Sequence, residues 1–485
     1  MAIASRRRAI TSVKSFINFL FSITYELSPI APSPCHPQSL DKSPGPRLRQ
    51  PMANQAKWPR GAWSWALYDW ANSAFVLTVA TVFAGPFFQR YWFDGPEERA
   101  FSLNSLNVTL ASLLVAVCAP LIGAFAAGGR RKKATLAAFA ALGCASTVAL
   151  AALPQGAWEL AFAFRLTAAL GFFGSLVVYD ALLPAVSSPS NRHVISGLGF
   201  SLGYLGSVML LFAQFAVVNN PGLLGFETSA PAIKLSFVTV ALWWACFTVP
   251  LLLNVREPAM ADTAHSAPQR TSAAAVFGEI WQTLKEIWRL PALRWFLLAY
   301  YFYIDGVNTL TQLATAFGDQ LGIPMNTMMG TIILVQIVGV PCAVGFGWLG
   351  QRFGPKPFII VAVCIYMGVT AYAFRLTNET FLLFGLEVHP FYVLGLLIGI
   401  VQGGLQALSR SLFTNLLPAG DGDAARFFGL YNMLGKGGAI MGPLLMGGVS
   451  LAFGDPRAGA LAVAVLFIIG LVLVAKVRVE QAHPA

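Results

Sequence analysis

Long apolar runs separated by short polar loops occupy most of this 485-residue chain. A helix that crosses a membrane needs about 20 predominantly apolar residues. Twelve runs have about this length, at residues 62–87, 104–128, 134–153, 157–183, 194–218, 232–253, 293–318, 325–349, 357–375, 389–413, 427–452 and 456–476. The pattern predicts an all-α membrane protein with twelve transmembrane helices.

The longest internal polar interruption lies near the middle of the chain and divides the runs into two sets of six. Within it, the apolar positions of Val276–Trp288 recur with the period of a helix. We therefore expect an N-terminal six-helix half at 58–253, a cytoplasmic linker with an amphipathic helix at 254–292, and a C-terminal six-helix half at 293–485.

Residues 1–57 differ from the rest of the chain. Three arginines at 6–8 precede a mixed apolar stretch, Phe16–Ile23, which superficially resembles a targeting segment. The stretch is short, and Asn18 and Ser22 interrupt it. We expect residues 1–57 to be a disordered N-terminal extension or a non-native start, with Met52 as the alternative first residue; a targeting segment is the other interpretation.

Charge supports the membrane assignment and predicts an orientation. Only 11% of the residues are charged, against about a quarter in soluble domains. The net charge is +11, and the basic residues gather in alternate loops, for example at 130–133, 192 and 352–356. By the positive-inside rule both termini are cytoplasmic. A nucleic-acid partner is disfavoured, because the basic residues follow loop topology and form no single patch.

Two short strings place an acid and an amide three residues apart inside apolar runs. They are Tyr68-Asp-Trp-Ala-Asn72 and Ile304-Asp-Gly-Val-Asn308, and their acids, Asp69 and Asp305, are 236 residues apart. A carboxylate inside a membrane helix costs roughly 3 kcal/mol or more. Its occurrence at matching positions in two halves indicates a duplicated transporter with a polar site at its centre.

Other landmarks repeat with nearly the same offset. Leu182–Ala185 and Leu416–Ala419 are 234 residues apart, as are Arg192 and Arg426. Because each half contains six spans, the repeats have the same topology. The halves are therefore expected to be parallel repeats related by an axis along the membrane normal.

The polar residues within the spans are candidates for a central site. A buried carboxylate holds a proton more readily than an exposed one, so Asp69 and Asp305 are candidates to carry protons or to hold a substrate ammonium group. The alternative is helix–helix hydrogen bonding through the Asp and Asn side chains. Lys436 is expected at a similar depth, either as the partner of one acid or as a carboxylate-binding group. We predict a substrate or proton pathway formed by Asp69, Asn72, Asp305, Asn308, Gln402 and Lys436.

A second group of charged residues lies at cytoplasmic helix ends or in cytoplasmic loops. Such charges more often close a gate or cap a helix than bind a substrate. The group comprises Asp180, Arg192, Arg352, Lys356, Arg410 and Arg426.

Several strings resemble known families. Gly347-x-x-x-Gln351-Arg-Phe-Gly-Pro-Lys356 resembles the loop signature of the major facilitator superfamily, with Gln351 where the usual form has Asp. In the superfamily that acid helps to latch one conformation, and this chain lacks the acid at that position. The strings starting at Trp65, Tyr179, Gly199, Gln402 and Phe428 resemble the vacuolar amino-acid effluxer family, which includes fungal autophagy-related effluxers and bacterial permeases.

The resemblance covers roughly residues 58–478. It implies a major facilitator fold, no cofactor, and export or exchange of small solutes, with amino acids as the substrate class suggested by the fungal members. We expect a monomeric secondary transporter in the bacterial inner membrane, with proton coupling as a hypothesis. The alternatives are a lipid or lysolipid flippase of the same fold and a membrane sensor that binds a solute without moving it.

Enzymatic activity and a metal site are not expected. The five histidines are scattered, the six cysteines are isolated, and neither H-E-x-x-H nor G-x-S-x-G occurs.

Overall fold

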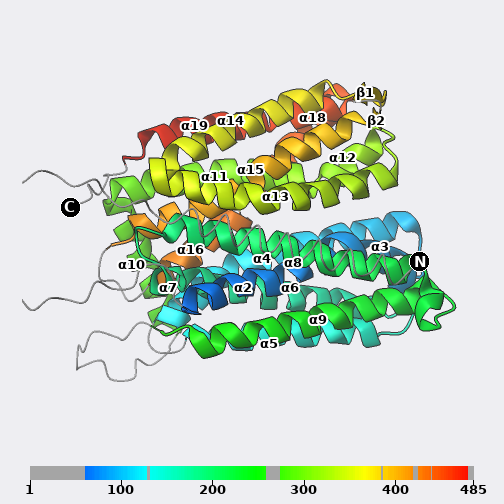
Figure 1. Cartoon of the computed structure of the whole chain (residues 1–485), viewed down its shortest axis with the longest axis horizontal. Helices are drawn as coiled ribbons and strands as arrows, with labels where there is room; N and C mark the ends of the chain where they lie inside the picture. Colours follow the sequence, from blue (N-terminus) through cyan, green and yellow to red (C-terminus); the bar gives the residue numbers. More distant parts are fainter. Residues whose placement is uncertain are drawn as a thin grey trace, which may run out of the picture. The chain divides into compact units, whose positions relative to one another are not determined.

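The computed structural model describes residues 60–127, 132–257, 273–383, 386–418, 424–437 and 440–478. The N-terminal extension expected at 1–57 lies outside these residues. The described chain is almost entirely helical, and the helices run roughly parallel to one another (Figure 1).

The first half begins with a helix that changes its pitch. α2 (Arg60–Ala74) continues as the π-helical segment η1 (Phe75–Phe83), then as α3 (Ala84–Phe87) and η2 (Phe88–Trp92). The remaining elements are α4 (Glu97–Ala127), α5 (Lys132–Ala152), α6 (Trp158–Ala181), α7 (Leu183–Val186), α8 (Arg192–Asn219), η3 (Pro221–Leu224) and α9 (Ser229–Asn254).

A linking helix, α10 (Ala273–Arg289), precedes the second half. The second half consists of α11 (Pro291–Gln312), α12 (Ala314–Gln320), α13 (Met325–Phe353), α14 (Pro355–Phe374), β1 (Phe381–Leu383), β2 (Leu386–Val388), α15 (Pro390–Leu416), α16 (Ala424–Gly437), α17 (Met441–Phe453), α18 (Pro456–Ala462) and α19 (Ala464–Lys476). The antiparallel pair β1–β2 lies in the loop between α14 and α15, where the sequence pattern predicted no strand.

Within the described residues, ten helical segments are long and apolar enough to cross a membrane. The seventh expected span corresponds to α11, whose apolar run is interrupted by polar residues such as Asp305 and Asn308. The eleventh corresponds to α16 and α17 together, two shorter helices. The predicted all-helical membrane fold is confirmed, although single apolar helices do not account for all twelve spans.

Each half has its own helix packing. In the first half α5 packs against α6 and α9, and α2 packs against α8 and α9. In the second half α13 and α14 pack against α15, and α11 packs against α19. The halves meet mainly through two pairs of helices, α4 with α16 and α8 with α13.

Glycines allow both of these pairs to approach closely. A Cβ on Gly123 would lie 2.5 Å from the Ala425 carbonyl oxygen and 2.8 Å from the Cα of Gly429. On the other side, a Cβ on Gly197 would lie 2.5 Å from the Ala343 carbonyl oxygen and 3.3 Å from the Cα of Gly347. Backbone contact through small residues is a common mode of helix association in membranes. The two contacts have corresponding partners, the ends of α4 and α13 and the beginnings of α8 and α16, as expected for a repeated structure.

Both glycine contacts lie at the end of the bundle where α8 begins and α13 ends. We call this the basic end, because Arg192 and Arg352 are located there. The helix α10 lies at the same end (Figure 1) and contacts both α4 and α16.

Candidate functional site

Arg410 of α15 forms buried ion pairs with two acids of the first half. Its Nη2 lies 3.4 Å from Oδ2 of Asp69 on α2, and its Nη1 lies 3.2 Å from Oδ1 of Asp180 on α6. All three side chains are buried. The ion pairs therefore join the two halves inside the protein.

The guanidinium group of Arg410 has five N–H donors and makes five hydrogen bonds. Besides its bonds to the two acids, Nε donates to Oγ of Ser196 and Nη2 donates to the Ser196 carbonyl oxygen, both at 3.0 Å. Three aromatic rings surround the same group, with Cζ between 4.5 and 5.4 Å from their centroids: Phe200, Trp65 and Tyr179. Guanidinium groups interact favourably with aromatic faces.

The two acids have neutral partners as well. The Tyr179 hydroxyl donates to Oδ2 of Asp69 at 2.8 Å, and Nδ2 of Asn432 on α16 donates to Oδ2 of Asp180 at 3.1 Å. A buried ion pair is tolerated only when its remaining hydrogen-bonding capacity is satisfied. We call this network the interlock; it consists of Asp69, Tyr179, Asp180, Ser196, Arg410 and Asn432.

A second layer of cross-half hydrogen bonds lies closer to the basic end. Nη1 of Arg192 donates to Oδ1 of Asn415 at 2.5 Å, and Nδ2 of Asn415 lies 3.2 Å from Nε2 of His193. Nδ1 of His193 in turn lies 2.7 Å from Oγ of Ser411. This layer ties the beginning of α8 to the end of α15.

Gln351 at the end of α13 also bridges the halves. Its Oε1 accepts from the backbone N–H of His193 at 3.2 Å, and its Nε2 donates to the Pro189 carbonyl oxygen at 2.9 Å. The residue that replaces the usual signature Asp thus makes two cross-half contacts without carrying a charge.

Asp305 on α11 belongs to a different network. Its Oδ2 accepts the backbone N–H of Gly442 at 2.9 Å, at the beginning of α17, and Oγ1 of Thr309 lies 3.5 Å from its Oδ1. The positive end of a helix dipole stabilises a carboxylate in this position. Asp305 is fully buried, and it has no ion-pair partner among the side chains that the structure describes.

Comparison with known proteins places the chain in a family. The family model described as "Vacuole effluxer Atg22 like" matches residues 95–193 and 187–485. The chain belongs to this Atg22-like family. Bacillus subtilis (strain 168) has a relative named "Uncharacterized MFS-type transporter YxiO", which is 35% identical over 424 residues, covering 86% of this chain and 94% of the relative.

Fungal relatives are more distant. Autophagy-related protein 22 of Coccidioides immitis is 23% identical over 85% of this chain and 77% of its own length. Autophagy-related protein 22-1 of Aspergillus fumigatus is 26% identical, and the match spans 48% of that protein.

Solved structures support the fold. The major facilitator superfamily transporter FucP in its outward conformation matches with a TM-score of 0.64 at 15% identity, covering 87% of this chain and 98% of FucP. The human organic anion transporter MFSD10 matches with a TM-score of 0.58 at 16% identity, covering 85% of this chain and 98% of MFSD10. The Bacillus subtilis relative, the apolar helices and the shared fold together identify the Atg22-like chain as an integral membrane transporter of the major facilitator type.

The predicted pathway residues fall into separate places in this Atg22-like fold. Asp69 is part of the interlock and pairs with Arg410, a residue assigned to the gate group, while Asp305 bonds within the second half. Asn308 also bonds there, because its Nδ2 donates to the Gly435 carbonyl oxygen at 2.8 Å. Asn72 is buried one turn beyond Asp69, and Oε1 of Gln402 has no hydrogen-bond partner in the described structure. Lys436 lies in α16, but its side chain is outside the described part.

The predicted gate residues also fall into two groups, those that join the halves and those that make other contacts. Asp180, Arg192 and Arg410 make contacts between the halves, as described above. Arg352 lies over the rings of Trp348 and Phe353 in its own half, and Lys356 donates to the Ala475 and Val477 carbonyl oxygens. Arg426 pairs with Glu286 of α10 at 2.7 Å.

Sequence reasoning missed several members of these networks. Tyr179 and Asn432 lie within strings that carried the family resemblance, next to or near acids and glycines, but nothing local showed their partners. His193 was grouped with scattered, mostly loop histidines; the structure buries it at the contact between the halves. Ser196 and Asn415 had no distinguishing signal in the sequence.

Proposed function

We propose that this chain is a secondary active transporter that exports small zwitterionic solutes, amino acids among them, by alternating access and in exchange for protons. The observation that carries the proposal is the interlock, in which one buried cation holds two buried acids of the opposite half. The family description, vacuole effluxer, supports export. The amino-acid class rests on the resemblance to the fungal members.

The interlock supplies a physical reason for alternation. Separating the halves at the basic end would take Arg410 away from Asp69 and Asp180 and leave buried charges without partners. Breaking a buried pair in this way costs about 3–5 kcal/mol. The basic end therefore opens only when water, a proton or a charged substrate group replaces the lost contacts. A zwitterion offers a carboxylate for Arg410 and an ammonium group for an acid.

Asp305 is the proposed proton carrier. It lies on a membrane helix, and its described contacts are hydrogen bonds and not an ion pair. An ionisable residue in this setting is a functional candidate by default. Protonation removes its buried charge, so its charge state can bias the packing of α11 against α17.

The orientation follows from the distribution of basic residues. With the basic end in the cytoplasm, we propose that the closed basic end is the cytoplasmic gate and that both termini lie on the cytoplasmic side of an inner membrane. Rocking of the two halves would then open the basic end to load the substrate and close it to release the substrate outside.

Counterflow in proteoliposomes tests this function. Vesicles that contain purified protein are preloaded with an unlabelled amino-acid mixture, and uptake of labelled amino acids is followed. The proposal predicts uptake above that of empty vesicles, loss of uptake in Arg410→Ala, and normal uptake in Arg375→Gln, a control at an exposed position. If the inserted wild type moves fluorescent lysolipid and no amino acid, the chain is a flippase. If it binds amino acids without counterflow, it is a sensor.

A further inference from the structure

The outer face of α10 carries three large aromatic side chains that are exposed and do not pack into the protein core. Phe277, Trp281 and Trp288 are 63%, 61% and 58% exposed. Their spacing of four and seven residues places them on one side of the helix. Contiguous exposed apolar side chains of this size mark a surface that contacts a partner or a membrane.

Basic side chains accompany these rings. Nζ of Lys285 lies 5.5 Å from the centroid of Trp281, and the guanidinium of Arg294 lies 5.6 Å from the centroid of Trp288. Lys285 and Arg289 form no ion pair with any described residue, whereas Glu286 on the inner side is paired with Arg426. The exposed face therefore has an excess of positive charge.

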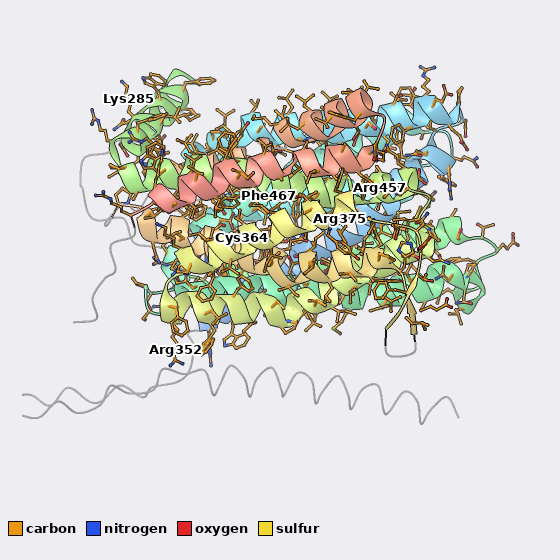
Figure 2. The ribbon with its side chains drawn as sticks, turned by 90° about the horizontal axis from the view of Figure 1, so that it is seen from above. Lys285, Arg352, Cys364, Arg375, Arg457 and Phe467 are labelled. Carbon is orange, nitrogen blue, oxygen red and sulfur yellow. The ribbon has the colours of Figure 1, made fainter. Side chains whose placement is uncertain are left out.

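The inner face of α10 is fixed to both halves. Thr283 and Ile287 are buried, and α10 contacts α4 of the first half together with α11 and α16 of the second. Leu290 alone separates α10 from α11, which is part of the helix bundle. The aromatic face thus lies at the level where the transmembrane helices leave the bilayer. In Figure 2 Lys285 lies at one end of the helix bundle, while Arg375 and Arg457 lie toward the opposite end.

We propose that this surface, formed by Phe277, Trp281, Lys285, Trp288, Arg289 and Arg294, binds the headgroup layer of anionic phospholipids. Tryptophan rings are stable at the membrane interface, and amphipathic helices with basic polar faces lie in that plane. The three basic side chains provide the complementary charge for the phosphates. Because α10 contacts α4 and α16, whose glycine contact closes the basic end, the bound headgroups are positioned to favour that closure.

The proposal can be tested without knowledge of the transported solute. Gly278 is exposed, and a Cβ there would meet no atom within 4 Å, so Gly278→Cys is a harmless site for an environment-sensitive fluorophore. The full-length protein, with its own cysteines replaced, is placed in phosphatidylcholine vesicles that contain brominated phosphatidylglycerol or brominated phosphatidylcholine. We expect severalfold stronger quenching by the brominated phosphatidylglycerol at equal mole fraction.

Variants that lack basic side chains distinguish specific binding of anionic headgroups from mere proximity of the helix to lipid. A basic residue near an anionic surface contributes about fivefold in binding. Lys285→Gln combined with Arg289→Gln should therefore abolish most of the preference, whereas Arg375→Gln at the opposite end should leave it unchanged. Equal quenching by the two lipids in the wild type would overturn the proposal, and so would the absence of quenching by either, which would indicate that a protein or water covers the face.

Discussion

Asp69 and Arg410 lie 341 residues apart in the chain, yet Oδ2 of the acid accepts from both Nη1 and Nη2 of the arginine at 3.4 Å. The acid belongs to the first helix of one half and the arginine to α15 of the other. In the proposed alternating-access cycle, opening of the basic end breaks this contact and closing restores it. On this proposal, the strength of the contact governs how often the basic end opens.

Replacing Arg410 should abolish transport. Arg410→Lys keeps the charge but provides three rotating donors in place of five fixed ones, so it cannot satisfy both acids and Ser196 together. We expect initial counterflow rates at least tenfold below wild type for Arg410→Lys and lower still for Arg410→Ala. Wild-type rates in Arg410→Lys would show that the five-bond geometry is not required.

Replacing Gly123 with the larger residue Leu should hold the basic end open. A Leu side chain there has no room beside Ala425 and Gly429, so α4 and α16 cannot approach. In a cysteine-free chain that carries Ala119→Cys, a buried position on α4, we expect Gly123→Leu to raise labelling by a thiol reagent severalfold. Gly345→Leu is the matched control on α13, because a Cβ at Gly345 meets no atom within 4 Å. Equal labelling in the two variants would contradict the closing role of the glycine contact.

Asp305→Asn should remove the pH dependence of transport. The amide is nearly isosteric and cannot ionise, so it cannot exchange protons across the cycle. We expect flux in Asp305→Asn to become independent of a pH gradient, while substrate binding persists. Asp319→Asn, an exposed acid on α12, is the control and should behave like the wild type. If gradient-driven flux survives in Asp305→Asn, a group other than Asp305 couples transport to protons.

Gln351→Leu should weaken closure only modestly. The change removes two cross-half hydrogen bonds, each worth about 1 kcal/mol, and leaves the ion pairs of the interlock in place. We expect the ratio of closed to open basic end to fall by roughly five- to thirtyfold, as read from spin-label distances across that end. An unchanged ratio would mean that Gln351 does not act as a neutral latch.

Much of the fold could be predicted because its signals are local. The length of an apolar run and the alternation of loop charge depend on neighbouring residues only, and the twofold Asp–Asn pair revealed the duplication. The polar residues of α11 also explain why the seventh span is less apolar than the others.

The sequence could indicate which polar residues are candidates for the site, but not which of them contact one another. Sequence spacing gives depth along a helix, and it favoured Lys436 as the partner of one of the acids, whereas Arg410 was expected to belong to a gate at a cytoplasmic helix end. The observed pairing of Arg410 with Asp69 and Asp180 depends on where α15 lies relative to α2 and α6, which no local pattern encodes. The same limit applies to His193 and Gln351, whose partners lie in the opposite half.

In the proposed mechanism the interlock holds the basic end closed, and transport requires this end to open. The most direct test is the distance between spin labels at Ser190 and Phe353, two exposed positions in opposite halves at that end, in a cysteine-free chain reconstituted in lipid. We expect a short distance in the wild type with a minor longer population, and a shift to the longer distance in Arg410→Ala. An unchanged short distance in Arg410→Ala, in a protein that still transports, would contradict it.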